Sequence, residues 1–253
     1  MFLHGIEDFA IVRGDTLLAP AFYTNDHLEQ FDCVLANPPF SLKGWGAKNW
    51  ASDRYNRNVF GVPTDGNGDY AWIMHMMASM NPVSGRMAVV MPLGVLFRGG
   101  REAAIRTRLL QGDLVEAVIE LQQNLFYGTG IAACILVIRM DKGEADRGKV
   151  RFINAGGIYT KGRGQNTLTP EQADEIFALY RDREDRAGLS RTVSIEEIHA
   201  AGYTLKLGQY LQAEQVQDTM TVDEALSELH SRLAAQQVTE DRLEGLLRKA
   251  GYL

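Results

Sequence analysis

The sequence predicts an α/β protein in which helices cover a β-sheet, and three observations support this fold class. Short runs rich in Val, Ile, Leu or Phe, bounded by Gly, Asn, Asp or Pro, have the length of buried strands. Segments with a helical spacing of apolar residues lie between these runs. The 253 residues are 45% hydrophobic and 23% charged, which is typical of an ordinary globular protein. Because strands alternate with helices, we expect a largely parallel sheet with helices on both faces.

The apolar runs and the helical patterns give the following elements. The expected strands are 9–12, 31–36, 87–91, 115–121, 132–140 and 150–153. A helix over 70–80 is apolar on nearly all sides and should be buried, whereas a helix over 101–111 places Arg106 on its solvent side. A charged turn over 140–148 joins the last two strands, which predicts an antiparallel hairpin over 132–153.

The remaining third of the chain is expected to be mainly helical. A helix over 169–181 begins with Thr169 and Pro170, a capping residue followed by proline in the first turn. Two more helices, 222–237 and 239–250, carry stripes of leucine and predict a helical hairpin over 222–250. Since two helices cannot bury both stripes by themselves, the hairpin must pack on the main domain or on a partner.

The charge balance excludes nucleic-acid binding by bulk charge. The chain has 26 Lys and Arg against 32 Asp and Glu, so its net charge is −6. Contact with DNA therefore requires a local basic patch. Basic residues cluster near the motifs described below, although ordinary solvated surfaces explain such clusters equally well. The candidates are Lys43, Lys48, Arg54, Arg57, Arg98, Arg101, Arg106, Arg108, Lys161 and Arg163.

The cysteines, histidines and apolar stretches exclude several other classes. Cys33 and Cys134 both lie in apolar runs, which indicates buried thiols in a reducing cytoplasm. The five histidines have no metal-ligand spacing, so no metal site is expected. The longest apolar stretch, 87–97, is interrupted by Pro92 and Gly94 and is too short to cross a membrane.

One loop carries a pattern with chemical meaning. Asn37-Pro38-Pro39-Phe40 directly follows the predicted strand 31–36, and open α/β sheets build their sites at the carboxyl ends of strands. The two prolines stiffen the loop and remove two N–H donors. The loop then presents two acceptors, the Asn37 side-chain oxygen and the Pro38 carbonyl, beside the Phe40 ring. Such a loop fits an amino group on an aromatic ring; the alternative is a simple strand-terminating turn.

This loop belongs to an ordered set of segments that resembles the modification subunit of type I restriction-modification systems. That subunit is a DNA adenine-N6 methyltransferase that uses S-adenosylmethionine. The matching segments are HGIEDFAIVRGDTL, FDCVLANPPFS, GDYAWIMHMM, GRMAVVMPLGVLFRG, IRTRLL, VEAVIEL, NLFYGTGI and RFINA. The resemblance implies a partial Rossmann-like methyltransferase sheet with a C-terminal helical extension. Residues 1–165 are then a partial catalytic domain, and 166–253 a mainly helical region.

The resemblance also assigns roles to particular residues. The catalytic loop consists of Asn37, Pro38, Pro39 and Phe40. Phe40 and Phe126 are expected to stack on the two faces of a flipped adenine, although Phe126 also fits a core aromatic, with Tyr127 as its substitute. Asp15 and Thr16 are assigned to the cofactor, although Asp15 also fits an acidic turn residue. Asp69 is most simply a helix N-cap, and the alternative is a role in cofactor binding.

The implied function is methyl transfer from S-adenosylmethionine to adenine in DNA, in the cytoplasm, within a complex that contains a specificity subunit and a restriction subunit. The family's glycine-rich cofactor loop is expected before Asp15, and the sequence does not contain it. The chain therefore resembles an N-terminally truncated subunit that is inactive by itself. The alternative function is an inactive fragment that acts only as an assembly module with the specificity subunit. A protein-glutamine methyltransferase fits the neighbouring segments less well.

Overall fold

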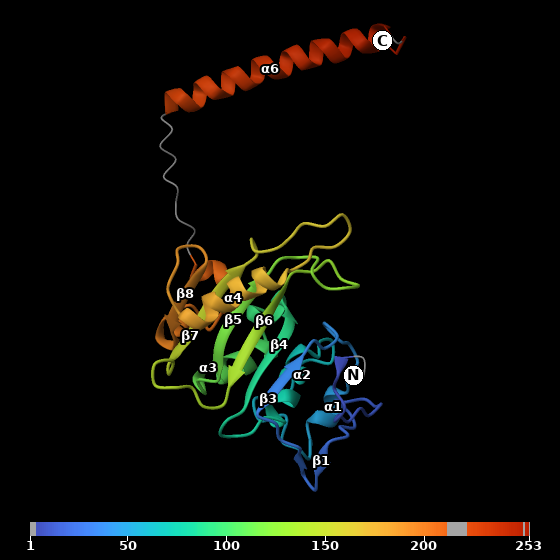
Figure 1. The fold of residues 1–253 in the computed structure, drawn as a ribbon, viewed down its shortest axis with the longest axis vertical. Helices are drawn as coiled ribbons and strands as arrows, with labels where there is room; N and C mark the ends of the chain where they lie inside the picture. Colours follow the sequence, from blue (N-terminus) through green and yellow to red (C-terminus); the bar gives the residue numbers. More distant parts are fainter. Residues whose placement is uncertain (1–3, 212–221, 250, 253) are drawn as a thin grey trace. The chain divides into compact units, whose positions relative to one another are not determined.

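The computed structural model describes residues 4–211, 222–249 and 251–252. The chain forms two compact units, Met1–Ala213 and Glu214–Leu253, which we describe separately. The first unit is an α/β domain built on a six-stranded sheet, and the described part of the second is dominated by one long helix (Figure 1). The predicted division after residue 165 differs from this one, because strands and helices beyond 165 complete the sheet domain.

The sheet of the first unit is mixed, with the strand order β3-β4-β6-β5-β7-β8. Its strands are β3 (Cys33–Ala36), β4 (Arg86–Pro92), β5 (Val115–Leu121), β6 (Ala133–Arg139), β7 (Lys149–Ala155) and β8 (Ser190–Ser194). The pairs β3–β4 and β5–β7 are parallel, while β4–β6, β5–β6 and β7–β8 are antiparallel. A separate two-stranded sheet pairs β1 (Tyr23–Thr24) with β2 (His27–Leu28). The α/β class is thus confirmed. Four of the six strands run in the same direction, and the antiparallel strands β6 and β8 make the sheet mixed.

Helices cover both faces of the sheet. They are α1 (Ala47–Trp50), α2 (Asp69–Ala78), α3 (Arg101–Gln111), α4 (Pro170–Asp182) and α5 (Ile195–Ala200), with two short 3-10 helices, η2 (Leu93–Leu96) and η3 (Leu207–Gln209). Val118 of β5 packs in the cluster that contains α2 and α3, whereas its neighbour Ile119 packs in the cluster that contains α4. Because successive side chains of a strand point to opposite faces, α4 lies on the other face from α2 and α3.

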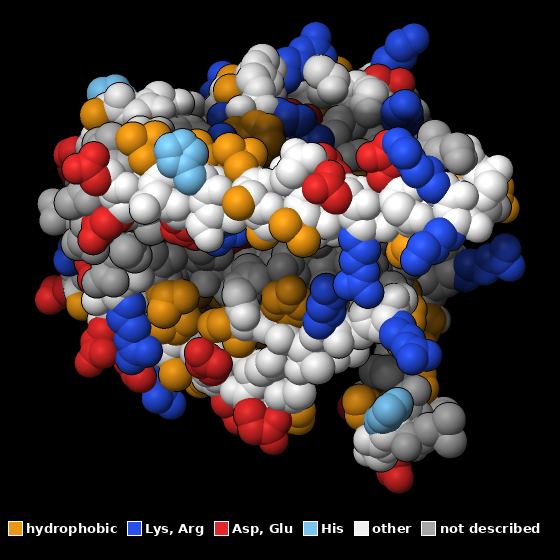
Figure 2. Space-filling view, turned by 90° about the horizontal axis from the view of Figure 1, so that it is seen from above, with side chains coloured by type: hydrophobic (Ala, Val, Ile, Leu, Met, Phe, Trp, Pro, Cys, Tyr) orange, Lys and Arg blue, Asp and Glu red, His pale blue; other side chains and the backbone are white. Residues whose placement is uncertain are grey.

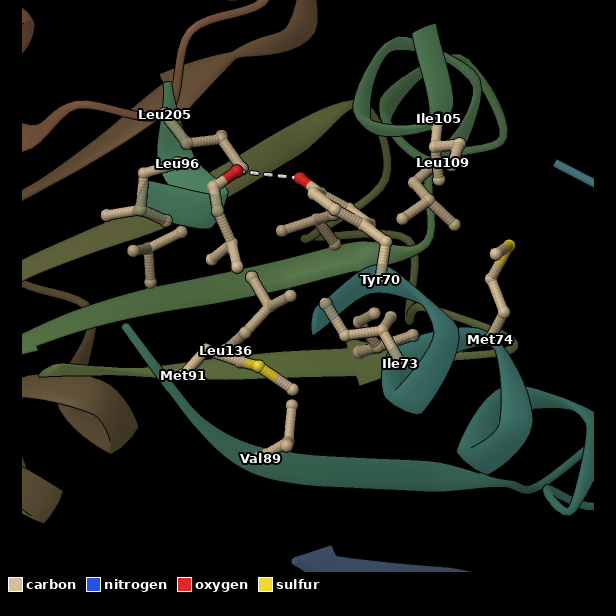
Figure 3. Close-up of a cluster of buried hydrophobic side chains, with 14 of the residues drawn as sticks. Tyr70, Ile73, Met74, Val89, Met91, Leu96, Ile105, Leu109, Leu136 and Leu205 are labelled. Atoms are coloured by element: carbon tan, nitrogen blue, oxygen red, sulfur yellow. Dashed lines mark hydrogen bonds between the residues drawn. The ribbon is translucent and has the colours of Figure 1, made fainter. Parts of the chain in front are cut away.

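The larger core lies between α2, α3 and the sheet. Tyr70 and Ile73 of α2 meet Ile105 of α3 and Val89 of β4, all of them buried (Figure 3). The Tyr70 hydroxyl donates a hydrogen bond to the carbonyl of Val95 at 2.7 Å. This bond satisfies the one polar atom of a ring that is otherwise surrounded by apolar side chains. The predicted burial of the helix over 70–80 is confirmed.

The predicted strand over 9–12 does not form. These residues lie outside any strand, and Ile11 is 74% exposed. A strand needs a neighbour to pair its backbone groups, and among the described residues β3 pairs only with β4 in this sheet. β3 is therefore an edge strand, and its Leu35 is also 74% exposed.

The predicted hairpin over 132–153 is also wrong. The two strands exist as β6 and β7, but β5 lies between them and pairs with both. The connection over 140–148 is long enough to pass the end of one strand, since skipping a strand requires only about 10 Å. β5 is buried along nearly its whole length, which is consistent with its interior position in the sheet.

Some buried and exposed positions also differ from expectation. Cys134 is buried as predicted, but Cys33 is exposed on the edge strand β3. Arg106 is only 3% exposed rather than on the solvent side of α3. Its guanidinium donates to the carbonyls of Val95, Arg98 and Tyr203. The charge is buried because these acceptors replace water, which apolar spacing alone does not reveal.

The second unit contains one helix, α6 (Val222–Lys249), rather than the predicted hairpin. The helix continues through Val238, where the leucine pattern suggested a break. Leu229, Leu233 and Leu243 are each more than half exposed. Acidic and basic side chains lie among the exposed apolar ones on the surface (Figure 2). None of the described helices is long and apolar enough to cross a membrane.

Candidate active site

The loops that carry the sequence motifs meet at one edge of the sheet. β3, β4, β5 and β7 run in the same direction, because β3 is parallel to β4, β5 is parallel to β7, and β6 is antiparallel to both β4 and β5. The segments 37–46, 122–132 and 156–169 follow the carboxyl ends of β3, β5 and β7. The last two extend beyond the sheet on the same side of the domain (Figure 1). This edge is where open α/β sheets place their sites.

A cavity of about 430 Å³ lies between the first two of these segments. We call 37–40 the NPPF loop and 122–132 the aromatic loop. The residues that line the cavity are Asn37, Pro38, Pro39, Phe40, Phe126, Tyr127, Thr129 and Ile131. The structure thus brings the four residues of the NPPF loop together with Phe126, which is 86 positions away from Phe40 in the sequence.

Asp69 fixes the end of the NPPF loop. Ser41, the next residue, has a left-handed backbone with φ of 52°, and its N–H donates to Asp69 Oδ1 at 2.7 Å. The other oxygen of Asp69 accepts from the Arg98 guanidinium, which also donates to Glu102 Oε2 at 2.8 Å. Asp69 is completely buried. It is the first residue of α2 and Gly68 is the N-cap, so the predicted capping role is wrong.

The residues after Ser41 are held just as firmly. The Gly68 N–H donates to the carbonyl of Leu42 at 2.9 Å, and the Trp45 indole N–H donates to the carbonyl of Thr64 at 2.8 Å. Trp45 and Trp50 are both buried and meet edge to face at 5.1 Å between ring centroids. These tryptophans are core residues in this structure.

The aromatic loop presents two rings of different exposure. Phe126 is partly buried and packs against the cluster beneath α4, while Tyr127 is 93% exposed. Gly128 follows with φ of 76°, a conformation that glycine adopts without strain. Phe126 is thus anchored by packing and Tyr127 is free to meet a ligand.

The lining of the cavity favours positioning rather than proton transfer. None of the described residues that line it carries a carboxylate, an imidazole or an ammonium group. The Asn37 side chain makes no hydrogen bond to a described residue, so its oxygen remains available as an acceptor. By contrast, the partly buried His75, whose pKa is lowered to about 4 by desolvation and by Arg57, lines a different cavity. The cavity can therefore orient an amino group and stack a ring.

Asp15 and Thr16 are placed elsewhere. Asp15 Oδ1 accepts from the N–H groups of Leu17 and Leu18, each at 3.0 Å, which is the geometry of an acidic turn residue. Thr16 lines a cavity of about 230 Å³ together with Phe31, Val34 of β3 and His75 of α2. The described residues that line the cavity of the NPPF loop do not include either of them. The structure therefore does not bring these two residues together with Asn37 around one cavity.

No group of three or more metal-ligating side chains occurs within residues 4–211, 222–249 and 251–252.

A family model and individual relatives in sequence indicate the same protein family. The sequence model of the N-6 DNA methylase family matches residues 1–219. The MjaVII type I restriction enzyme methylase subunit of Methanocaldococcus jannaschii is 32% identical over 222 residues, which cover 83% of this chain and 37% of that protein. The HindI methylase subunit of Haemophilus influenzae is 30% identical over 260 residues, which cover 98% of this chain and 56% of that protein.

Solved structures agree with the sequence relatives. The methyltransferase subunit of a type I restriction-modification system from Streptococcus thermophilus has a TM-score of 0.66 and 32% identity, covering 73% of this chain and 38% of that one. The EcoKI M protein has the same fold, with a TM-score of 0.54 at 20% identity. The chain spans 37% of the length of the MjaVII methylase subunit and 56% of the length of the HindI methylase subunit.

Proposed function

This chain belongs to the N-6 DNA methylase family, and we propose that it supplies the adenine-binding side of a type I DNA methylase. In this proposal the reaction is transfer of a methyl group to N6 of an adenine that has been flipped out of the duplex. One observation carries the proposal. The Asn37 and Pro38 acceptors lie with Phe40 and Phe126 around one cavity at the carboxyl edge of the sheet.

The two acceptors address the main chemical difficulty of this reaction. The N6 amino group of adenine is a poor nucleophile, because its lone pair is delocalised into the ring. When Asn37 Oδ1 and the Pro38 carbonyl accept its two N–H bonds, the nitrogen moves towards tetrahedral geometry and its lone pair becomes available. The acceptors belong to a stiff loop and need little reorganisation during the reaction. The chain thereby lowers the barrier by positioning and electrostatics.

The aromatic side chains hold the extruded base. Flipping costs a few kcal/mol of stacking, and new stacking in the protein must offset it. Phe40 approaches the cavity from the NPPF loop and Phe126 from the aromatic loop. We propose that the two rings take the two faces of adenine. The exposed Tyr127 is the alternative for the second face.

The methyl donor that the family resemblance implies is S-adenosylmethionine. Asp15 and Thr16 are the residues of this chain assigned to it, but they lie apart from the cavity that holds Asn37. The relatives are about twice as long as this chain. We propose that residues outside these 253 complete the cofactor side of the site.

The isolated chain should not bind the cofactor. We expect S-adenosylmethionine to bind the 253-residue chain with a Kd weaker than about 1 mM, because Asp15 and Thr16 are assigned to only one end of the ligand and do not line the cavity that contains Asn37. Calorimetric titration checks this, with a full-length relative as the positive control. Micromolar affinity would contradict the proposed division of the site.

The test of the function itself uses a subunit of the same length as the relatives. We define the full-length assembly as a methylase subunit that carries this chain after the N-terminal half of a longer relative, combined with a specificity subunit. Supplied with labelled S-adenosylmethionine and duplex DNA, it should produce N6-methyladenine, detected after nuclease digestion. Labelled cytosine, or label on protein glutamine, would contradict the proposal. No label at all, with the subunits still associated, would favour the alternative of an inactive assembly module.

The second unit supports a role in assembly. α6 exposes a series of leucines along its length, of which Leu226, Leu229, Leu233, Leu243 and Leu246 are each about half exposed. Exposed apolar stripes of this kind pack against other helices in bundles. We propose that α6 contacts helices of the specificity subunit, and that the restriction subunit joins the same complex.

Removal of α6 should prevent assembly with the specificity subunit without affecting the folding of the first unit. We expect truncation after Gln217 to abolish co-purification with the specificity subunit and to change the melting temperature of the first unit by less than about 2 °C. The reason is that every member of the two core clusters lies between Leu17 and Leu211. Differential scanning calorimetry and affinity co-purification measure the two effects. Unfolding of the truncated chain would show that α6 belongs to the core and would contradict the partner assignment.

A further inference from the structure

The three segments around the carboxyl edge of the sheet contain no acidic residue. Segments 37–46, 122–132 and 155–168 contain Lys43, Lys161 and Arg163 but no Asp or Glu, in a chain whose net charge is −6. These three segments therefore carry only positive charge, and the excess of acidic residues lies outside them. A local field of this kind attracts an anion despite the overall charge of the protein.

Most other basic residues of the domain are already engaged. Arg57 is buried against Asp53, Arg98 pairs with Asp69 and Glu102, and Arg106 is buried against backbone carbonyls. These three were candidates for contact with phosphate on sequence grounds, and the structure gives them structural partners instead. Lys161 and Arg163, by contrast, are exposed and form no ion pair with a described residue.

Lys161 and Arg163 lie at the end of a hairpin that is attached to the aromatic loop. Thr160 and Thr167 exchange backbone hydrogen bonds of 2.9 and 3.0 Å, and this closes the hairpin below its two basic residues. We call 158–168 the basic hairpin. Its exposed tip, 161–164, extends into solvent.

Hydrogen bonds fix the basic hairpin against the aromatic loop. The Asn124 side chain donates to the carbonyl of Gly164 at 3.0 Å, and the Asn124 carbonyl accepts from the Asn166 N–H at 2.9 Å. Gln165 Nε2 donates to the carbonyl of Leu125 at 3.0 Å. The carbonyl that Gln165 contacts precedes Phe126, which lines the cavity. The hairpin that carries the two charges is thus fixed to the loop that contributes Phe126 to the cavity.

We infer that Lys161 and Arg163 bind backbone phosphates of the DNA strand whose adenine enters the cavity. The inference rests on the proposed function and specifies how the substrate is held. A flipped nucleotide remains attached to its neighbours through phosphodiesters, so phosphates must lie at the rim of the cavity that receives the base. Contacts of basic side chains with phosphates fix the register of a protein on DNA without reading its sequence.

Salt dependence of DNA binding tests this inference. The full 253-residue chain is titrated into a short fluorescein-labelled DNA duplex between about 50 and 200 mM salt, and affinity is measured by anisotropy. Each phosphate contact contributes about 0.9 to the slope of log affinity against log salt concentration. The double variant Lys161→Ala/Arg163→Ala should therefore lose about 1.8 from the magnitude of the slope if each residue binds one phosphate.

A matched control is available at the opposite edge of the sheet. Arg147 and Lys149 are one Arg and one Lys at the same spacing, both exposed, where the chain enters β7. The variant Arg147→Ala/Lys149→Ala removes the same charge and should leave the slope unchanged. Circular dichroism confirms that both double variants remain folded, as expected for exposed positions.

Two results would overturn the inference. The first is that the two double variants have the same salt slope, whether both lose slope equally or both keep the slope of the parent chain. The second is that the chain does not bind DNA at the lowest salt concentration. Failure of the proposed function gives a different result, the absence of N6-methyladenine from the full-length assembly. A methylating assembly whose DNA affinity is insensitive to Lys161 and Arg163 would therefore refute only the contact with phosphate.

Discussion

Replacing Asn37 by Ala in the full-length assembly is expected to lower the rate of methyl transfer at least about 100-fold, because an acceptor that acts in the transition state is lost. The Asn37 side chain is exposed to the cavity and bonds to no other described residue. Its removal should therefore leave folding and DNA affinity close to those of the parent assembly. Single-turnover methylation with tritiated S-adenosylmethionine measures the rate without interference from product release.

The control for Asn37→Ala is a substitution at another polar residue of the same cavity. Thr129 also lines the cavity, and among the described residues its hydroxyl accepts from the N–H of Ile131 alone, at 3.2 Å. Thr129→Ala removes a polar group without removing a proposed acceptor of the adenine amino group, so the rate should change by less than about tenfold. If Asn37→Ala also costs less than about tenfold, the role assigned to Asn37 is wrong.

The sequence was sufficient to predict those features of the fold that depend on residues close together in the chain. β5 and α3 begin and end where the apolar patterns predicted, and α4 begins with the capping residue Thr169. The NPPF loop was found because its composition is unusual and because it follows a strand directly. Such signals are local, so they remain readable without knowledge of the rest of the fold.

The features that the sequence did not reveal depend on distant partners. The place of β5 between β6 and β7 follows from pairing across the sheet, and the spacing of apolar residues does not encode it. β8 (Ser190–Ser194) reads SRTVS and has no apolar run, although it pairs with β7 along its length. Arg106 appears solvent-facing by helical spacing until the carbonyls that surround it are known.

Asp69 is the residue near the candidate site whose role depends most on partners that are distant in the sequence. Its sequence context, just before an apolar helix, is typical of a capping residue. Its partner is the N–H of Ser41, 28 positions earlier, and its counter-ion is Arg98, 29 positions later. The carboxylate therefore joins the loop after β3 to the segment after β4. The two loops meet only in the folded domain, so a local pattern could not assign this role.

Replacing Asp69 by Ala is expected to lower the free energy of unfolding by about 3 kcal/mol and the rate of methyl transfer more than about tenfold. The loss of stability follows because Ser41 N–H and Arg98 lose a buried acceptor, while Arg98 keeps only Glu102. The loss of rate follows because Ser41, whose φ is 52°, no longer holds the NPPF loop in place. Denaturant unfolding of the chain and single-turnover rates of the full-length assembly, at saturating DNA and well below its melting temperature, separate the two effects.

Two further variants distinguish a positioning role from general destabilisation. Asp69→Asn keeps an oxygen for the Ser41 N–H and should recover most of the rate, although it loses the ion pair with Arg98. Asp113 makes a parallel set of contacts at the opposite edge of the sheet, with the Gly148 N–H at 2.9 Å and with Lys142. Asp113→Asn should lower stability but change the rate by less than about threefold. If Asp69→Ala and Asp113→Asn lower the rate equally, or if Asp69→Ala leaves it unchanged, Asp69 supports the fold without positioning the loop.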